Sequence, residues 1–177
     1  MPRRTESVED GWDLVERARG GDRDAFGQLF RLHHAAVFRV ARARLPHALA
    51  EDAAAETFVR AWVALPRYRR TGAPFASWLY GIARNVVADM VRRSYRTEAR
   101  DELDGGVVDP WGSRDDHLAL ADALAALPEE QRQVIELKFL MGLTNDEVGA
   151  ALGKKPGAVN AQQWRALRAL ERLLGSR

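Results

Sequence analysis

The sequence contains no cysteine among its 177 residues. This absence excludes disulfide bonds and every zinc site that needs thiolate ligands. Long apolar segments are also missing: the longest stretch without a charged residue, from Thr71 to Ala83, is shorter than the roughly 20 residues of a membrane-spanning helix. The basic residues near the N-terminus are not followed by an apolar run, so no secretory signal peptide is expected. We therefore expect a cytoplasmic protein with no membrane insertion.

Motifs of catalysis and metal binding are missing as well. No nucleophile motif and no phosphate-binding glycine loop occurs. His33 and His34 are adjacent, so on a helix their side chains would point about 100° apart and make a poor metal pair. Asp52 and Glu56 would share a helix face, but such a pair on a polar helix is usually solvated surface. The sequence predicts a protein that is not an enzyme and needs no metal or cofactor.

Apolar residues recur at helical spacing over most of the chain. We expect helices over 12–19, 22–45, 49–65 and 74–95, then over 118–127 and 128–142, with two more between 143 and 174. Asp22 is the expected N-cap of the second helix. Pro46 and Pro66 each end a helical segment, because proline disfavours helix in the residue before it. No segment alternates with a period of two, so no strand is expected.

The composition changes between Arg96 and Asp116. Glycine, proline and acidic residues replace the helical pattern there, which is typical of a flexible and self-repelling linker. The sequence therefore predicts an all-α fold made of two small helical domains, 8–96 and 117–175, joined by a flexible acidic linker over 97–116. The formal net charge is only +2, so the charge is informative segment by segment.

The clearest local motif lies in the last part of the chain. Thr144 and Glu147 have the spacing of a capping box that starts a short helix, and Gly153 supplies a turn before a longer amphipathic helix. This is the pattern of a helix-turn-helix, whose second helix enters the DNA major groove. An ordinary surface helix pair is the alternative. The six basic residues against one acid between Lys154 and Arg177 favour DNA binding.

The outward positions of the second helix define the expected duplex-reading face. Asn can read adenine edges, and Arg can read guanine or hold phosphate. Lys154 and Lys155 precede the helix, where they could neutralise phosphate. The residues expected on the face itself are Asn160, Ala161, Trp164, Arg165 and Arg168.

A second concentration of positive charge lies between Arg67 and Arg96, with seven arginines against one acid. Aromatic residues are interleaved with these arginines. Arginines that track phosphate and aromatic faces on which bases stack suit single-stranded DNA. Phe75 and Leu79 are expected in the core instead. The residues that lie in a loop, and are therefore better placed to bind a base, are Tyr68, Arg69 and Arg70.

Four sequence blocks together resemble the bacterial extracytoplasmic-function (ECF) sigma factors, the minimal members of the sigma-70 family. The blocks are GDRDAF at 21–26, AEDAAAETFVRAW at 50–62, FASWLYGIARN at 75–85 with Asp89 and Arg92-Arg93 downstream, and LPEEQR at 127–132 followed by the helix-turn-helix. Their order and spacing make the resemblance specific, and it covers nearly the whole chain. It implies that 8–96 is sigma region 2 and that 117–175 is sigma region 4.

The resemblance implies a transcription initiation factor that binds core RNA polymerase and directs it to promoter DNA. The residues implied in polymerase binding are Asp52, Glu56 and Arg60. Those implied in capturing the melted −10 strand are Tyr68, Arg69, Arg70, Trp78, Arg84, Asn85, Arg92 and Arg93. Those implied in reading the −35 duplex are Lys154, Lys155, Asn160, Ala161, Trp164, Arg165 and Arg168. An anti-sigma factor is a further implied partner.

This chain departs from the family pattern at a few positions. Ala55 stands where the family usually has Gln, in the helix implied to bind polymerase. Asn160 and Gln162 stand where Lys or Arg is common, and Trp164 is bulkier than the usual residue, which implies a different −35 sequence.

Other classes of function explain less of the sequence. A helix-turn-helix regulator that binds only duplex DNA accounts for the end of the chain, but it leaves 50–62 and 67–96 unexplained. A helical adaptor protein without a DNA role would not need the basic segments.

Overall fold

The computed structural model describes residues 4–98 and 114–175, with side chains over 11–94 and 119–175. The first lobe consists of α1 (Arg4–Arg19), α2 (Arg23–Arg42), α3 (His47–Ala64), the short 3-10 helix η1 (Leu65–Arg67) and α4 (Phe75–Glu98). The second consists of α5 (Arg114–Ala126), α6 (Glu129–Ile135), the π-helix η2 (Glu136–Leu140), α7 (Asn145–Leu152) and α8 (Pro156–Gly175). The described residues include no strand, so the expected all-α fold is confirmed. Most of the expected linker lies outside the described residues.

Local sequence signals account for most helix boundaries. The Asp22 carboxylate accepts hydrogen bonds from the backbone N–H groups of Asp24 and Ala25 and so caps α2, as expected. Pro46 and Pro128 immediately precede α3 and α6, where their missing N–H groups leave no helical hydrogen bond unmade. The first helix is longer than the sequence predicted, since α1 begins at Arg4.

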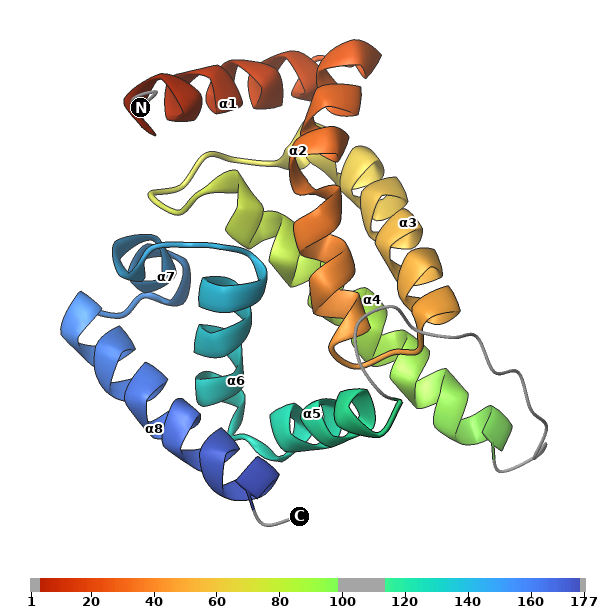
Figure 1. Ribbon diagram of the computed structural model, residues 1–177. Coiled ribbons are helices and arrows are strands. Elements are labelled where there is room, and N and C mark those ends of the chain that lie inside the picture. The colour runs from red at the N-terminus through yellow and green to blue at the C-terminus, as the bar shows by residue number, and fades with distance from the viewer. Residues whose placement is uncertain (1–3, 99–113, 176–177) are drawn as a thin grey trace.

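The first lobe packs around α2 and α4 (Figure 1). Small residues on the inner face of α3, including Ala50, Ala53, Ala54 and Ala61, are fully buried. Because alanine has a single methyl group, α3 approaches both α2 and α4 closely. Larger residues fill the remaining core, with Phe75 and Leu79 among them, as expected from the sequence.

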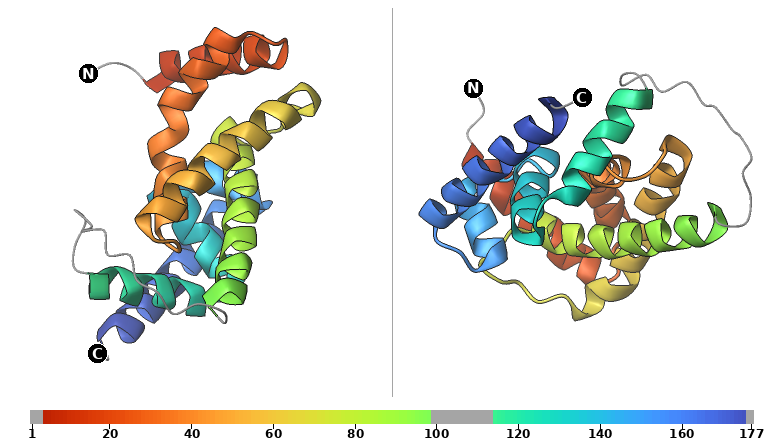
Figure 2. Two further views of the ribbon diagram at one scale, coloured as in Figure 1. Left: turned by 90° about the vertical axis from the view of Figure 1, so that its right-hand side faces the viewer. Right: turned by 90° about the horizontal axis from the view of Figure 1, so that it is seen from below.

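The second lobe packs against α4 and the C-terminal half of α2 (Figures 1 and 2). One apolar cluster runs through both lobes: Leu79 and Ala83 of α4 belong to it together with Val134, Leu137 and Val148 of the second lobe. A second cluster joins Ala43 at the end of α2 to α5, α6 and α8. The two helical lobes therefore share a core in this structure.

The segment between α6 and α7 contains a π-helix that the sequence did not predict. The backbone N–H of Met141 donates to the carbonyl of Glu136, five residues earlier, instead of four. The side chain of Arg39, from α2, donates to the carbonyl of Leu140 at 3.0 Å. The helical segment ends at Leu140, close to the expected end near Gly142. Gly142 has a φ of 77°, a left-handed conformation that favours glycine.

Candidate nucleic-acid interface

The helix-turn-helix has the local geometry that its sequence predicted. The Thr144 hydroxyl accepts from the backbone N–H of Glu147 at 3.3 Å, and the Glu147 carboxylate accepts from the backbone N–H of Thr144 at 2.7 Å. These two bonds form the capping box that begins α7. Gly153 ends α7 in the left-handed conformation, with φ of 64°. The chain then turns through Lys154 and Lys155 into α8.

Gly149 lets the turn approach α7. A Cβ atom at this position would lie 2.5 Å from the backbone oxygen of Lys154, which is closer than non-bonded atoms come. In the native chain, Gly149 accepts a hydrogen bond from the backbone N–H of Lys154 at 2.9 Å. The relative placement of the two helices therefore depends on the missing side chain.

One face of α8 is exposed as the duplex-reading hypothesis requires. Val159, Ala166 and Leu170 are buried, whereas Trp164 is 62% exposed. The Arg168 guanidinium lies 5.4 Å from the centre of the Trp164 ring, at cation–π distance. The other residues expected on this face are also exposed, and they are Asn160, Ala161 and Arg165.

The exposed face of α8 borders a hollow beside the start of α6. The hollow has a volume of about 600 Å³ and a mostly apolar wall. Three of the expected duplex-reading residues line it, together with Pro128 and Gln131 from the other side. These three are Trp164, Arg165 and Arg168.

Two polar residues on α8 are held by neighbouring elements. The Asn145 side chain, at the start of α7, donates to the side-chain oxygen of Asn160. Glu130, in the first turn of α6, accepts from the Lys154 ammonium at 3.1 Å and from the Gln162 amide at 3.0 Å. The sequence did not predict these contacts of Glu130, because Lys154 and Gln162 lie 24 and 32 positions further along the chain.

The loop between η1 and α4 presents arginines but buries its tyrosine. Tyr68 is only 6% exposed; its ring stacks on Trp12 with the ring centres 6.3 Å apart and also contacts Phe75 and Trp78. Burial raises the pKa of the Tyr68 hydroxyl, which has no hydrogen-bond partner among the side chains and backbone that the structure describes. The Tyr68 ring thus belongs to the core in this structure, although its loop position favoured base binding.

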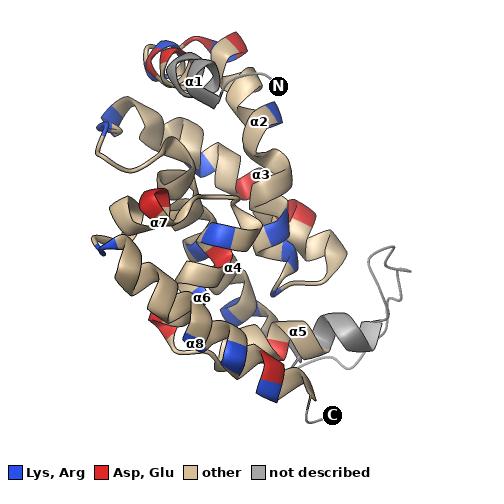
Figure 3. Ribbon diagram, turned by 60° about the vertical axis from the view of Figure 1, so that its left-hand side comes forward, with Lys and Arg blue, Asp and Glu red and all other residues tan. Residues whose placement is uncertain are grey.

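Arg69 and Arg70 are exposed. The Arg70 guanidinium lies 4.3 Å from the centre of the Trp12 ring, so α1 contacts the loop that carries Arg69 and Arg70. The role of Trp12 was not predicted from the sequence. Figure 3 shows that Lys and Arg are spread over both lobes rather than gathered on one patch.

The residues of α4 expected to bind the −10 strand form two groups, one beside the second lobe and one exposed further along the helix. Trp78, Arg84 and Asn85 line a hollow of about 390 Å³ whose other wall comes from α6, η2 and α7. Arg84 also forms an ion pair with Glu129 of α6. Arg92 and Arg93 lie further along α4 and are exposed. The second lobe therefore borders part of the expected single-strand surface.

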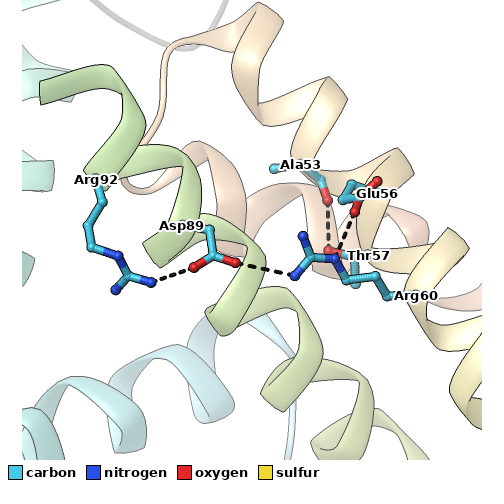
Figure 4. Close-up of polar contacts among 6 residues, drawn as sticks. All are labelled: Ala53, Glu56, Thr57, Arg60, Asp89 and Arg92. Carbon is cyan, nitrogen blue, oxygen red and sulfur yellow. Dashed lines mark hydrogen bonds and ion pairs between the residues drawn. The ribbon is translucent and has the colours of Figure 1, made fainter. Parts of the chain in front are cut away.

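The residues expected to bind polymerase lie on α3. Asp52 is exposed, and Glu56 accepts from Arg60 one turn later at 2.7 Å. Arg60 also pairs with Asp89 of α4 at 3.3 Å, and Asp89 in turn pairs with Arg92 (Figure 4). The hydrogen bond from Arg60, followed by the charge of Arg92, lowers the pKa of Asp89.

Glu56 and Arg60 therefore belong to a network that joins α3 to α4. The buried Thr57 hydroxyl, which lies beside this network, donates to the carbonyl of Ala53 at 2.7 Å (Figure 4).

A buried polar pair joins the two lobes. The Tyr80 hydroxyl donates to a carboxylate oxygen of Glu136 at 2.7 Å, and Glu136 is only 2% exposed. Burial raises the pKa of the Glu136 carboxyl, while the hydrogen bond from Tyr80 and the charges of Arg132 and Arg44 oppose the rise. Burial also raises the pKa of Tyr80. The only sequence signal for this pair was an acidic residue between Ile135 and Leu137.

Two further properties of the described residues bear on the site. None of the helices in the described part combines the length and apolar character needed to cross a membrane. Within the same part of the chain, no three His, Cys, Asp or Glu side chains are grouped so as to hold a metal ion.

Comparison with known proteins agrees with this arrangement of helices. Residues 29–97 match the model of sigma-70 region 2, and residues 117–170 match that of sigma-70 region 4. The chain is 39% identical to the ECF RNA polymerase sigma factor BldN of Streptomyces coelicolor, covering 92% of this chain and 65% of that protein. It is 37% identical to the ECF RNA polymerase sigma factor ShbA of Streptomyces griseus, covering 90% of this chain and 93% of that protein.

Solved structures show the same fold. CnrH in complex with the cytosolic domain of CnrY matches with a TM-score of 0.69 and 30% identity, over 94% of this chain and 98% of that one. RpoE in complex with the anti-sigma factor NepR, from Bartonella quintana, matches with a TM-score of 0.58 and 26% identity, over 85% of this chain and 96% of that one. The protein belongs to the ECF sigma factors of the sigma-70 family, which are promoter-directing transcription initiation factors.

Proposed function

We propose that the protein binds core RNA polymerase and directs it to promoters by reading a −35 duplex with α8 and capturing the melted −10 strand with the first lobe. The observation that carries this proposal is the exposed face of α8, where Trp164, Arg165 and Arg168 border one hollow. Aromatic and guanidinium groups on the outward face of a helix-turn-helix recognition helix are suited to base edges and phosphates. The chemistry of RNA synthesis belongs to the polymerase, and the protein works in the cytoplasm with it.

The proposed division of the chain follows its two lobes. Region 2 occupies 8–96 and carries polymerase docking and −10 capture, and region 4 occupies 117–175 and carries −35 reading; residues 97–116 connect them. Asp52, Glu56 and Arg60 form the proposed polymerase-binding surface, with Ala55 exposed on the same helix. The loop between η1 and α4, which carries Arg69 and Arg70, supplies the proposed −10 contacts together with α4.

An anti-sigma factor is part of the proposal. The two matched structures above contain a sigma factor together with the cytosolic domain of CnrY or with the anti-sigma factor NepR. The close resemblance in fold supports an equivalent partner for this chain, which would bind the same DNA and polymerase surfaces.

The test is co-purification with bacterial core RNA polymerase, followed by run-off transcription from genomic fragments with and without the protein. We expect binding to core and transcripts that start at new sites. Binding to duplex DNA without binding to core would instead support a duplex-only helix-turn-helix regulator.

A further inference from the structure

Glu130 connects three elements around the proposed duplex-reading helix. Glu130 lies in the first turn of α6 and is not part of the exposed face of α8. Each of its two carboxylate oxygens contacts a different side chain. One accepts from Lys154, in the turn before α8, and the other accepts from Gln162, in the second turn of α8. Both contacts have ordinary hydrogen-bond lengths, 3.1 Å and 3.0 Å.

The contact with Glu130 changes what Lys154 can do. The Lys154 side chain is 26% exposed, so its stem is largely covered and its ammonium group ends at the carboxylate. Lys154 and Glu130 together carry no net charge. A neutral pair releases no counterion from DNA, whereas a lysine paired with phosphate does. The adjacent Lys155 is exposed and is well placed to supply such a phosphate contact.

The contact with Gln162 holds the helix itself. Gln162 is half-buried at the flank of the exposed face of α8. Its amide N–H group is bound to α6, so rotation or sliding of α8 against α6 would break that bond. Glu130 therefore does two things at once: it holds α8 in place through Gln162, and it neutralises the charge of Lys154 just before the N-terminus of α8.

We propose that Glu130 is a positioning residue for duplex binding, which withholds the Lys154 charge from DNA phosphate and anchors α8 through Gln162. This inference rests on the proposed function of α8. Its consequence is specificity: binding relies less on phosphate contacts, which are alike for all sequences, and more on base contacts.

The test measures how the affinity of the full chain for a random-sequence DNA duplex depends on salt concentration. The variants are Glu130→Gln, Glu130→Gln with Lys154→Ala, and Lys155→Ala as the reference for loss of one phosphate contact. One additional phosphate contact steepens the slope of log affinity against log salt by about 0.9. We therefore expect the affinity of Glu130→Gln, divided by the affinity of the native chain at the same salt concentration, to fall about 3.5-fold between about 50 and 200 mM salt.

The Lys154→Ala change should remove that gain, and Lys155→Ala should lower the native slope by a similar amount. Glu51→Gln is the matched control for net charge, since Glu51 is exposed on α3 of the first lobe and not on α6 or α8. Thermal unfolding of each variant verifies that it is folded.

The outcomes separate the two proposals. If the native chain binds no duplex at any salt concentration, the proposed function fails. If the native chain binds but Glu130→Gln has the native slope, the role of Glu130 is refuted and the proposed function stands. The same conclusion follows if the double variant Glu130→Gln with Lys154→Ala keeps the steeper slope of Glu130→Gln.

Discussion

At the scale of single residues, the loop arginines are the most direct test of strand capture. Replacing Arg69 and Arg70 by Ala should impair promoter opening while duplex binding is retained, because both residues belong to the loop between η1 and α4 and not to α8. Fluorescence of 2-aminopurine placed in the −10 region of a promoter found by run-off transcription measures opening, and a duplex-binding assay runs in parallel. The matched control replaces Arg23 and Arg31, two exposed arginines of α2. Equal loss of both activities in the loop variant would mean that the loop is only a general basic patch.

Glu136 makes the stability of the protein dependent on pH. Its pKa is raised above its ordinary value of 4.5 in the folded state, so the folded state retains a proton that the unfolded state releases. The contribution of this group is therefore fully present below pH 4.5 and is lost as the pH rises through the folded-state pKa. Over that window, the free energy of unfolding falls by up to about 1.4 kcal/mol per pH unit.

Glu136→Gln should remove this loss and keep an acceptor for the Tyr80 hydroxyl. Urea unfolding at several pH values should show that the variant gains stability relative to the native chain as the pH rises. Glu51→Gln, at an exposed position, is the control. A difference between Glu136→Gln and the native chain that is the same at every pH would contradict the assignment.

At the scale of elements, two glycines that each lie inside a helix should change the stability of the protein in opposite directions when replaced by alanine. Gly149→Ala places a Cβ 2.5 Å from the Lys154 backbone oxygen, so we expect a destabilisation of about 1–3 kcal/mol. At Gly81, within α4, an added Cβ would meet no described atom within 4 Å outside the adjacent backbone of its own helix, and Gly81→Ala should stabilise by about 0.5–1 kcal/mol. Chemical denaturation measures both. Stabilisation by Gly149→Ala would show that α7 and the turn can separate at no cost.

At the scale of the whole molecule, the two lobes share a core and are therefore closed against each other in this structure. The second lobe borders Trp78, Arg84 and Asn85, and the Tyr80–Glu136 bond is buried between the lobes. We expect the lobes to separate when the protein binds polymerase and promoter DNA, because a DNA strand on this part of α4 requires the same space.

The absence of native cysteine makes this separation measurable with two introduced thiols. Dyes at Ala48→Cys in α3 and Ala126→Cys in α5, both exposed positions, report the distance between the lobes. Energy transfer should fall when core polymerase and promoter DNA are added, and a pair within the first lobe, Arg23→Cys with Ala48→Cys, should change little. Unchanged transfer between the lobes would mean that the closed arrangement itself binds the promoter.

Features that depend on local interactions can be read from the amino-acid sequence alone. The helices, the Asp22 cap, the Thr144–Glu147 capping box and the left-handed turn at Gly153 follow from residues within a few positions of one another. The sequence blocks were enough to place the chain in its family, because they repeat a known order and spacing.

The contacts between distant segments depend on tertiary packing. The Tyr80–Glu136 bond joins residues 56 positions apart, and the burial of Tyr68 depends on Trp12 in another helix. Glu130 likewise acquires its contacts through the packing of α6 against α8. A carboxylate or a tyrosine has the same local preferences whether it faces solvent or a neighbouring lobe. Its burial, its partner and its pKa are therefore set by packing, which local sequence patterns do not specify.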